Sequence, residues 1–238
     1  MTTGYGQFCP VAVASEIFAE RWTPIILREL MLGSRRFNDI HRGAPRISRA
    51  LLTRRLRELE ASEVIESVLR TDGKGREYRL TASGEEMGEI VVRLGEWGQR
   101  WTARFERQRL DPGLLLWDMR RRIAVERLPA QRTVVRFDFR GVPAILRRPK
   151  TYWLVMEPPD VGLCYSDPGQ DVDVYVDAEI AVLARVWMGD EPLAHAMRAG
   201  AVKIGGDPRL SRAFPGWLML STLAAVPRPA EQTQRRVA

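Results

Sequence analysis

The segment from Arg35 to Ile65 constrains the fold of this 238-residue chain more than any other stretch. It predicts a short helix over Phe37–Arg42, a turn over Gly43–Arg46 and a second helix over Ser48–Ala61. The turn is indicated because glycine permits unusual backbone angles and proline disfavours a helical residue before it. Ser48 is suited to cap the second helix, since its hydroxyl can accept an otherwise unpaired backbone N–H. The segment therefore predicts two helices joined by a tight turn.

The second of these helices separates an apolar stripe from a basic face. Leu52, Leu56 and Leu59 recur at spacings of four and three, which places them on one buried side. Arg54 and Arg57 then point away from that side. Positions 35 to 57 hold eight arginines and one acidic residue. A helix pair with this charge is suited to the major groove of DNA, although many arginine-rich helix faces simply face water.

The residues after the second helix predict a β-hairpin. Val64–Arg70 and Arg76–Leu80 have the pattern of strands, and the glycine-rich turn Thr71–Gly75 joins them. Lys74 and Arg76 lie at the tip of this hairpin. Two helices followed by a basic hairpin describe a winged helix-turn-helix, so the segment is expected to bind DNA.

Two helices are predicted before this segment. Cys9-Pro10 opens the first and Thr23-Pro24 opens the second, because proline costs no hydrogen bond in the first helical turn. A helix N-terminus stabilises a thiolate, which makes Cys9 the one candidate reactive residue. The alternative is that Cys9 only caps or packs.

A long helix is predicted after the hairpin. Thr81 or Ser83 caps it, with Glu86 in capping-box position relative to Ser83, and its apolar spacing continues to Phe105. This helix is longer than is needed to close the unit. Together with the first helix it is expected to form a dimer interface, because DNA-binding proteins of this kind usually contact two half-sites.

The motifs of this half of the chain resemble the HxlR-type family of regulators. The resemblance rests, in order, on Cys9-Pro10, Glu20–Leu30, Arg36–Ile40, Ile47-Ser48, Leu52–Glu60 and Tyr78–Thr81. It implies a dimeric, MarR-like bacterial transcription factor with a winged domain on each protomer. In some regulators of this family, a cysteine at the position of Cys9 senses oxidants or electrophiles. The winged domain is commonly almost the whole protein in this family, whereas here a second half follows.

That second half predicts a separate domain that mixes strands and helices. Asp111 caps and Pro112 starts a helix that continues through Trp117 to Val125. Strands are expected at Thr133–Phe139, Thr151–Met156, Gly162–Ser166, Val172–Val176 and Ala201–Ile204, and helices at Glu179–Met188, at Leu193–Arg198 and in a closing region from Asp207 that includes Trp217, Leu218 and Met219. The expected fold is therefore α+β, with a winged domain over residues 1–108, a second domain over 109–227 and a disordered tail over 228–238.

The end of the second domain resembles a sterol-carrier-protein domain. The resemblance rests on a strand, a helix that contains Trp187, and the segment Gly200–Pro208. It implies an α/β domain in which a curved sheet packs on helices around an apolar pocket. The candidate pocket residues, for which ordinary core packing is the alternative, are Trp117, Trp153, Met156, Trp187, Met188, Trp217 and Met219.

The basic face and the wing supply the candidate DNA contacts. Base edges and the nearest phosphates are expected to be contacted by Ser48, Arg49, Thr53 and Arg54. Arg46 and Arg57 are expected to contact phosphates, and Lys74 and Arg76 to contact the minor groove or the DNA backbone. Arg55 lies nearer the leucine stripe and is expected to be structural.

From composition, we do not expect a disulfide-stabilised, secreted or membrane-spanning protein. Hydrophobic residues make up 45% of the chain and charged residues 28%, and the net charge of +7 suits a polyanionic partner. Cys9 and Cys164, the two cysteines, cannot form a disulfide framework and fit a reducing cytoplasm, and no signal peptide is visible. The longest uncharged run, residues 213–227, has 15 residues, fewer than the roughly 20 that a membrane-spanning helix needs.

Catalytic and metal-binding motifs are not found in the sequence. The two histidines, His41 and His195, are far apart and neither has metal-ligand spacing around it. No serine elbow, phosphate loop or dinucleotide fingerprint occurs. An enzyme, a metal site and a cofactor are therefore not expected.

Two functions remain open. The leading hypothesis is a cytoplasmic homodimeric regulator that binds double-stranded DNA at an inverted-repeat operator, using the helix Ser48–Ala61 and the wing Asp72–Arg76. In this hypothesis the second domain binds an apolar small molecule that changes the affinity for DNA. The alternative is a carrier of lipids or hydrophobic compounds whose basic half serves assembly. The arginines of residues 35–57 favour the regulator.

Overall fold

The computed structural model describes residues 4–71, 73–102 and 109–227. The chain divides into two compact units, one ending at Glu96 and the other beginning at Trp97. Residue Asp72 of the predicted wing, the stretch 103–108 before the predicted domain boundary, and the predicted tail 228–238 lie outside the described residues. The boundary after residue 108 stays a prediction.

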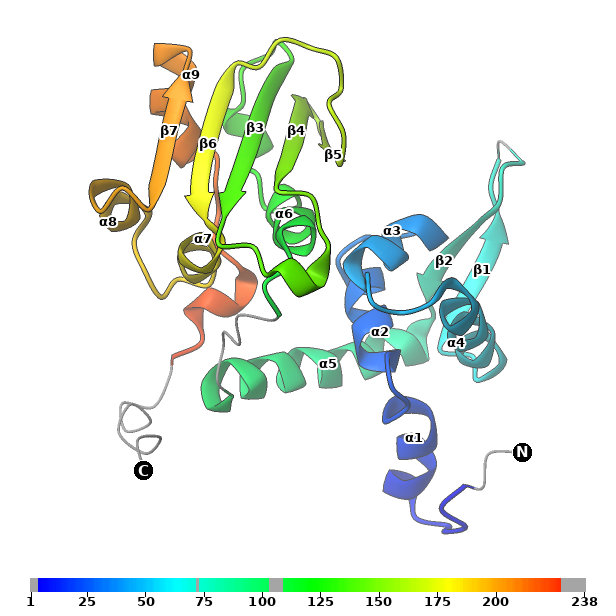
Figure 1. The fold of residues 1–238 in the computed structure, drawn as a ribbon. Helices are drawn as coiled ribbons and strands as arrows, with labels where there is room; N and C mark the ends of the chain where they lie inside the picture. Colours follow the sequence, from blue (N-terminus) through cyan, green and yellow to red (C-terminus); the bar gives the residue numbers. More distant parts are fainter. Residues whose placement is uncertain (1–3, 72, 103–108, 228–238) are drawn as a thin grey trace, which may run out of the picture. The chain divides into compact units, whose positions relative to one another are not determined.

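The first unit consists of five helices and a two-stranded sheet (Figure 1). The elements are α1 (Pro10–Phe18), α2 (Thr23–Met31), α3 (Phe37–Gly43), α4 (Arg49–Ala61), β1 (Ile65–Leu69), β2 (Arg76–Leu80) and α5 (Ala82–Trp101), of which the last continues past Glu96. β1 and β2 pair antiparallel, with Ile65 opposite Leu80. This order of elements is the predicted winged helix-turn-helix.

The core of this unit lies between α2 and α4. Leu52, Leu56 and Leu59 are buried, as their spacing predicts, and they belong to one cluster with Ile26 and Leu30 of α2. At the start of α4, the Ser48 hydroxyl accepts a hydrogen bond from the backbone N–H of Leu51 at 3.2 Å. The predicted cap is confirmed, so the first turn of α4 has a fixed position.

The prediction for the start of α5 is correct for Thr81 and wrong for Ser83. Thr81 is the capping residue, because its Oγ1 accepts a hydrogen bond from the backbone N–H of Gly84 at 3.2 Å. The Ser83 hydroxyl instead donates to the carbonyl of Glu63 at 3.0 Å. Ser83 therefore ties α5 to the end of the helix-turn-helix, and it does not form a capping box with Glu86.

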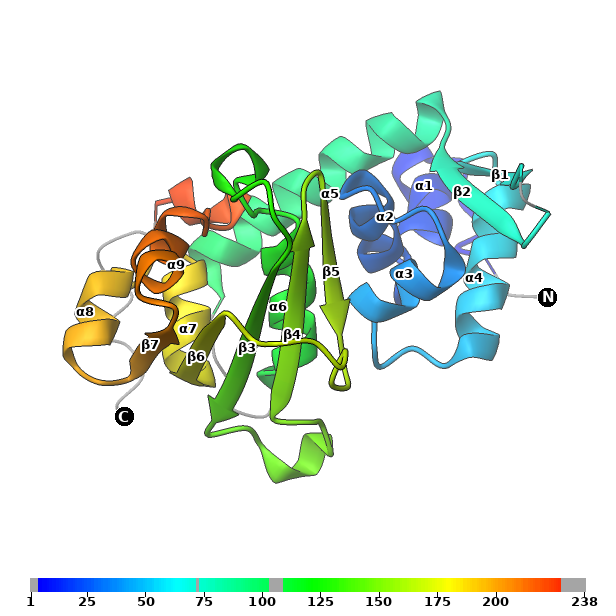
Figure 2. The ribbon, with the colours of Figure 1, turned by 90° about the horizontal axis from the view of Figure 1, so that it is seen from above.

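The second unit is a five-stranded mixed sheet with helices packed on one face (Figures 1 and 2). The strand order is β5-β4-β3-β6-β7, in which β3 and β6 are parallel and the other pairs are antiparallel. The elements are α6 (Pro112–Arg120), β3 (Thr133–Arg140), β4 (Thr151–Glu157), β5 (Asp160–Cys164), β6 (Val174–Glu179), α7 (Ile180–Trp187), α8 (Leu193–Arg198), β7 (Val202–Gly206) and α9 (Pro208–Ala213). Short 3-10 turns occur at Val125–Arg127, Ala144–Leu146, Phe214–Gly216 and Thr222–Ala225.

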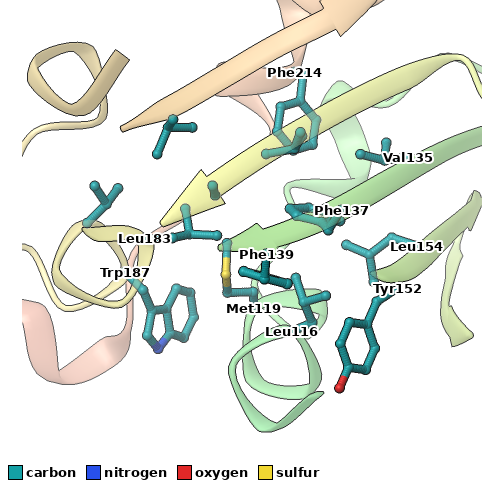
Figure 3. Packing of buried hydrophobic residues seen from close by; sticks show 14 of the residues in the cluster. Leu116, Met119, Val135, Phe137, Phe139, Tyr152, Leu154, Leu183, Trp187 and Phe214 are labelled. Carbon is teal, nitrogen blue, oxygen red and sulfur yellow. The ribbon is translucent and has the colours of Figure 1, made fainter. Parts of the chain in front are cut away.

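The helix-covered face of this sheet is aromatic. Alternate residues of β3 and β4, including Phe137, Phe139 and Tyr152, point toward α6 and α7 (Figure 3). Phe137 and Phe214 pack edge to face with ring centroids 6.1 Å apart. The strand period of two therefore gives each of these strands one buried face, as the sequence pattern indicates.

Strand β6 begins two residues later than predicted and extends further. Just before Val174, the Asp173 backbone N–H donates to the Val134 carbonyl at 2.9 Å, but the Val134 N–H donates to the Asp173 carboxylate at 2.7 Å, so a side chain replaces one of the backbone acceptors there. β5 also starts two residues earlier than predicted, because the tight connection at Pro158–Pro159 places Asp160 directly opposite Glu157.

Two predicted helical stretches in the second unit are wrong. α6 ends at Arg120 instead of continuing to Val125, and Trp217–Met219 is not helical. The two stretches pair with each other: the backbone N–H of Ala124 donates to the Trp217 carbonyl at 2.9 Å, and that of Met219 donates to the Arg122 carbonyl at 3.1 Å. This long-range pairing satisfies backbone groups that a helix would otherwise use.

Candidate nucleic-acid interface

Helix α4 presents its basic side to solvent. Arg54 and Arg57 are exposed on the side opposite the leucine stripe, whereas the exposed Arg49 lies on the flank of the stripe and the exposed Ser48 caps the helix. The side chain of Arg54 is 64% exposed and lies 3.7 Å from the Glu58 carboxylate, which is a loose surface pair. The fold therefore exposes these predicted contact residues at the start of α4 and along its outer side.

Thr53 differs from its arginine neighbours on α4. It is half-buried, and its Oγ1 donates to the carbonyl of Arg49 at 3.0 Å. The hydroxyl of a mid-helix threonine commonly forms this bond with the preceding turn. Thr53 can thus offer a ligand its methyl group and the acceptor capacity of its hydroxyl oxygen.

Arg49 is held by residues of α3. Its Nη1 donates to the side-chain oxygen of Asn38 at 3.0 Å, and its guanidinium carbon lies 5.7 Å from the centroid of the Phe37 ring. The ring of Phe37 in turn stacks on His41. Arg49 therefore has a defined orientation at the place where α3 meets α4.

The remaining predicted contacts lie on the turn and on the wing. Arg46 is exposed on the turn between α3 and α4, and Lys74 is exposed between β1 and β2. The predicted wing residue Asp72 falls outside the described residues. Arg46 and Lys74 both lie at exposed positions that a phosphate could approach.

Arg76 braces the wing. Its Nε donates to the Ser67 hydroxyl at 2.7 Å and its Nη2 to the Ser67 carbonyl at 2.9 Å, while the Ser67 hydroxyl donates to the Glu60 carboxylate at 2.5 Å. Burial, and secondarily the Glu60 carboxylate, raises the pKa of the nearby Tyr78 above its ordinary value, so its phenol stays neutral. The network ties the wing to the C-terminal end of α4.

The sequence pattern did not predict a part-buried ion pair that lies below the turn. The Glu29 side chain is fully buried; it pairs with Arg28 at 2.8 Å and accepts the Ser34 hydroxyl at 3.1 Å. Arg28 also donates to the carbonyl of Gly43 at 3.1 Å. Glu29 follows the buried Ile26 by three residues, so its place on the apolar face of α2 was the signal that could have identified it.

Arg55 takes no part in the basic face. Its side chain is 12% exposed and pairs with Glu20 and Glu58. The pair with Glu20 joins α4 to the residues just before α2, and the pair with Glu58 lies within α4. The observation agrees with the structural role expected from its position near the leucine stripe.

The two cysteines occupy different settings. Cys9 precedes the first residue of α1 and is half-buried, and its side chain makes no capping hydrogen bond. Cys164 is half-buried at the end of β5, opposite Trp153. Neither is bonded to another cysteine.

Four of the seven predicted pocket residues come together in the second unit. Met156, Trp187 and Trp217 are buried in its main cluster, and Met188 packs against that cluster. The other three lie elsewhere: Trp117 lies under Arg120 with the guanidinium carbon 3.6 Å from its ring, Trp153 lies beside Arg136, and Met219 is 42% exposed. Burial of Met156, Trp187 and Trp217 in the core agrees with the alternative of ordinary packing, and a pocket among them stays a prediction.

The described residues contain neither a candidate metal site nor a candidate membrane-spanning helix. Within residues 4–71, 73–102 and 109–227, His, Cys, Asp and Glu form no group of three or more that could hold a metal ion. Across the same ranges, every helix is too short or too polar to cross a membrane.

Comparisons with known proteins agree on the first unit. Residues 17–106 match the family model described as HxlR-like helix-turn-helix. The chain is 32% identical to the uncharacterised HTH-type regulator YdeP of Bacillus subtilis, covering 42% of this chain and 78% of that protein, and 32% identical to YvaP of the same organism, covering 46% and 95%. The reduced form of the B. subtilis regulator YodB is similar at 28% identity and a TM-score of 0.36, covering 40% of this chain and 96% of that one. Through residues 17–106, the chain belongs to the HxlR-like helix-turn-helix family of transcriptional regulators.

Proposed function

We propose that the protein is a dimeric transcriptional regulator that reads an inverted-repeat operator with the helix Ser48–Ala61 and the wing Asp72–Arg76. The observation that carries this proposal is the exposed basic side of α4: Arg54 and Arg57 lie opposite the stripe that is packed into the core, and Arg49 is exposed at the start of the helix. A supported helix with one basic face is the element that enters a major groove in proteins of this kind. Phosphate contacts fix its position, and base contacts give it specificity.

The candidate residues divide into a group assigned to base edges and a group assigned to phosphates and the wing. Ser48, Arg49, Thr53 and Arg54 lie in the first half of α4, so we assign them to base edges and the nearest phosphates. Arg46 and Arg57 flank that surface and are assigned to phosphates, and Lys74 is assigned to the wing contact. Arg76 is assigned chiefly to holding the wing, because its guanidinium already donates to Ser67.

Substitution of one residue from each group tests these assignments. Arg54→Ala is expected to weaken binding to a cognate site by about 1–3 kcal/mol and to relax one base position. Lys74→Ala is expected to weaken binding to all sequences alike and to flatten the salt dependence. Fluorescence anisotropy with selected genomic fragments measures both effects. If neither variant alters binding to any fragment, α4 is not the recognition helix.

The proposed dimer interface uses apolar faces of α1 and α5. Val11 and Val13 on α1, and Ile90 and Leu94 on α5, are each between 47% and 73% exposed. Apolar side chains repeated along two helices of one unit indicate a protein contact, and the proposed partner is a second copy of the chain. Two copies would offer two recognition helices to half-sites about 34–36 Å apart, or a multiple of that spacing.

Charged substitutions on α5 test the dimer. Ile90→Glu combined with Leu94→Glu is expected to give a monomer by light scattering and to weaken binding to an inverted repeat more than binding to a single half-site. An exposed control, Arg93→Glu, changes the charge of the same helix outside the apolar set. A wild-type protein that is monomeric at micromolar concentration and still binds DNA tightly would contradict the proposal.

For the second unit we propose a sterol-carrier-like domain that binds an apolar small molecule. Support comes from its aromatic interior and from Met156 and Met188, because methionine adapts to irregular ligand shapes. The alternative function is transport of lipids or hydrophobic compounds. Extraction of the purified protein with organic solvent, followed by mass spectrometry, tests whether such a compound is bound. A regulator requires in addition that the compound changes DNA affinity, and a carrier does not.

Cys9 is proposed as a sensor of oxidants or electrophiles, with simple packing as the alternative. Its position at the start of α1, a helix of the proposed dimer interface, supports a link between thiol chemistry and DNA binding. Treatment with diamide or a quinone should lower the DNA affinity of the wild type and leave Cys9→Ser unchanged. Equal responses of the two proteins would favour packing.

A further inference from the structure

Asn38 and Arg49 form a contact that bridges the two helices of the helix-turn-helix. Asn38 is exposed on α3, and its side-chain oxygen accepts the Arg49 Nη1 at 3.0 Å. The Phe37 ring lies 5.7 Å from the guanidinium carbon of Arg49. Arg49 is thus held by an amide and by an aromatic ring, both of which belong to α3.

The platform that holds Arg49 is itself attached to the turn. The rings of Phe37 and His41 are stacked with an interplanar angle of 8°, and the Nε2 of His41 lies 3.0 Å from the carbonyl oxygen of Ile47. Ile47 is buried and directly precedes the capping residue Ser48. The orientation of the Arg49 side chain is therefore coupled to the same turn that orients α4.

This arrangement leaves one edge of the guanidinium available. With Nη1 engaged by Asn38, the Nε and Nη2 donors of Arg49 have no partner within the described part of the chain. Two parallel N–H donors on one edge match the O6 and N7 acceptors that guanine shows in the major groove. Because the side chain is already ordered, less conformational freedom is lost when it meets a base.

We propose that Asn38 is a positioning residue that sets base specificity, holding Arg49 so that its Nε–Nη2 edge selects a guanine in each half-site. The proposal rests on the proposed role of α4 as the recognition helix. Asn38 acts through Arg49 and needs no base contact of its own. The rival role for an exposed asparagine at this position is a direct hydrogen bond to a phosphate, which would carry no preference among sequences.

A double-mutant cycle on the full-length protein tests the coupling. Wild type, Asn38→Ala, Arg49→Ala and the double variant are measured by anisotropy on the best duplex selected from a randomised pool, and on copies in which each guanine is replaced in turn. Arg49→Ala is expected to lose roughly 5- to 150-fold of preference at one guanine, the range of a good bidentate contact. Asn38→Ala should reduce the same preference by roughly 2- to 150-fold, the range of coupling between contacting residues, and should add nothing in the Arg49→Ala background.

A conservative variant separates positioning from a structural effect. Asn38→Asp keeps the acceptor oxygen, so it should retain the guanine preference while its added charge weakens binding to all duplexes alike. Arg42→Ala, on the same helix, is the control, because Arg42 pairs within α3 with Asp39 at 2.9 Å. That variant should leave every base preference unchanged. Unfolding temperatures of all variants should match that of the wild type, since these side chains are exposed or half-buried.

The possible results separate a failure of the Asn38 proposal from a failure of the proposal that α4 is the recognition helix. If Arg49→Ala and Arg54→Ala both change base preferences but Asn38→Ala weakens all duplexes equally in both backgrounds, Asn38 is a phosphate contact and the inference is overturned. If Arg49→Ala leaves every base preference intact while Arg54→Ala alters one, the inference fails although α4 remains the recognition helix. If neither arginine affects base preference, the recognition-helix proposal fails as well.

Discussion

Glu29 is a fully buried carboxylate directly below the turn between α3 and α4. Removing a partner from a buried carboxylate lowers the free energy of unfolding, because the remaining polar atoms lose hydrogen bonds and are not hydrated in exchange. Gly43 is small for a related reason: a Cβ at this position would lie 1.8 Å from the Glu29 carboxyl carbon. The geometry of the basic face of α4 therefore depends on the Glu29 carboxylate, although Glu29 is not a residue of that face.

Substitutions at Glu29 and Gly43 should have strongly coupled effects on the free energy of unfolding. Glu29→Ala is expected to destabilise the protein by about 1–3 kcal/mol, because the buried Ser34 hydroxyl loses its hydrogen bond to this carboxylate and Arg28 loses its ion pair with it. Gly43→Ala should also be destabilising in the wild type, but it should cost much less in the Glu29→Ala background, where the clashing carboxylate is gone. Urea unfolding of the two single variants and the double variant measures this. Additive effects would contradict the proposed contact.

The raised pKa of Tyr152 predicts how the free energy of unfolding changes at alkaline pH. Burial, and secondarily Asp111 and Tyr165, raises the pKa of this tyrosine well above its ordinary value of 10.0. The folded state therefore keeps its proton over a range in which the unfolded state loses it, so the contribution to stability is complete below pH 10.0 and declines as pH rises above it. Tyr152→Phe should have a shallower alkaline decline in the unfolding free energy than the wild type. Parallel curves would refute the assignment.

At the scale of elements, the wing is joined to α4 both by an apolar contact at its base, where Ile65 of β1 is buried with Leu56 and Leu59, and by hydrogen bonds further out. Ser67 lies on β1, Arg76 begins β2 and Glu60 lies in the last turn of α4. Their hydrogen bonds are partly exposed, and the outward side of the hairpin carries Leu69, which is 73% exposed. A two-stranded hairpin is marginally stable by itself, so this brace is expected to help hold the part of the wing that lies beyond the apolar base.

The brace gives a prediction that separates Arg76 from Lys74. Ser67→Ala and Arg76→Ala should both accelerate amide hydrogen exchange across β1 and β2, since each removes bonds that hold the hairpin. Lys74→Ala should leave exchange unchanged, although it also is expected to weaken DNA binding. If Arg76→Ala weakens DNA binding with no change in exchange, Arg76 is a direct contact and the bracing role is wrong.

The elements that the sequence predicts well are those governed by local chemistry. The Ser48 cap, the leucine stripe of α4 and both hairpin strands follow from neighbouring residues, and the structure confirms them. Errors arise where distant residues decide. The end of α6 depends on pairing between Ala124 and Trp217, and the start of β6 depends on the carboxylate of Asp173.

The candidate site shows the same division. Helical spacing predicts which arginines of α4 face solvent, and the structure places Arg54 and Arg57 there while it turns Arg55 into the protein. Spacing does not predict the partners that Asn38 and Ser67 supply, because these lie on other elements. Likewise, Trp117 and Trp153 are buried as their residue types indicate, but outside the cluster that contains Trp187.

At the scale of the whole molecule, the question is whether the second unit affects DNA binding. An effector can shift DNA affinity only if it binds the DNA-competent and DNA-incompetent states with different affinities. If an extracted compound is an effector, the coupling free energy is expected to be about 1–3 kcal/mol and to be reciprocal. Titration of the compound with and without operator DNA measures it. Equal compound affinity in both titrations would support the carrier.

The most direct measurement is the affinity of the purified full-length protein for its best selected genomic fragment and for a shuffled duplex of the same composition, at one fixed salt concentration. A sequence-reading regulator should bind the selected fragment roughly 10³- to 10⁷-fold more tightly. The selected fragments should contain an inverted repeat, and combining Arg49→Ala with Arg54→Ala should remove most of the difference. Equal affinity for the selected and shuffled duplexes would contradict a recognition role for α4.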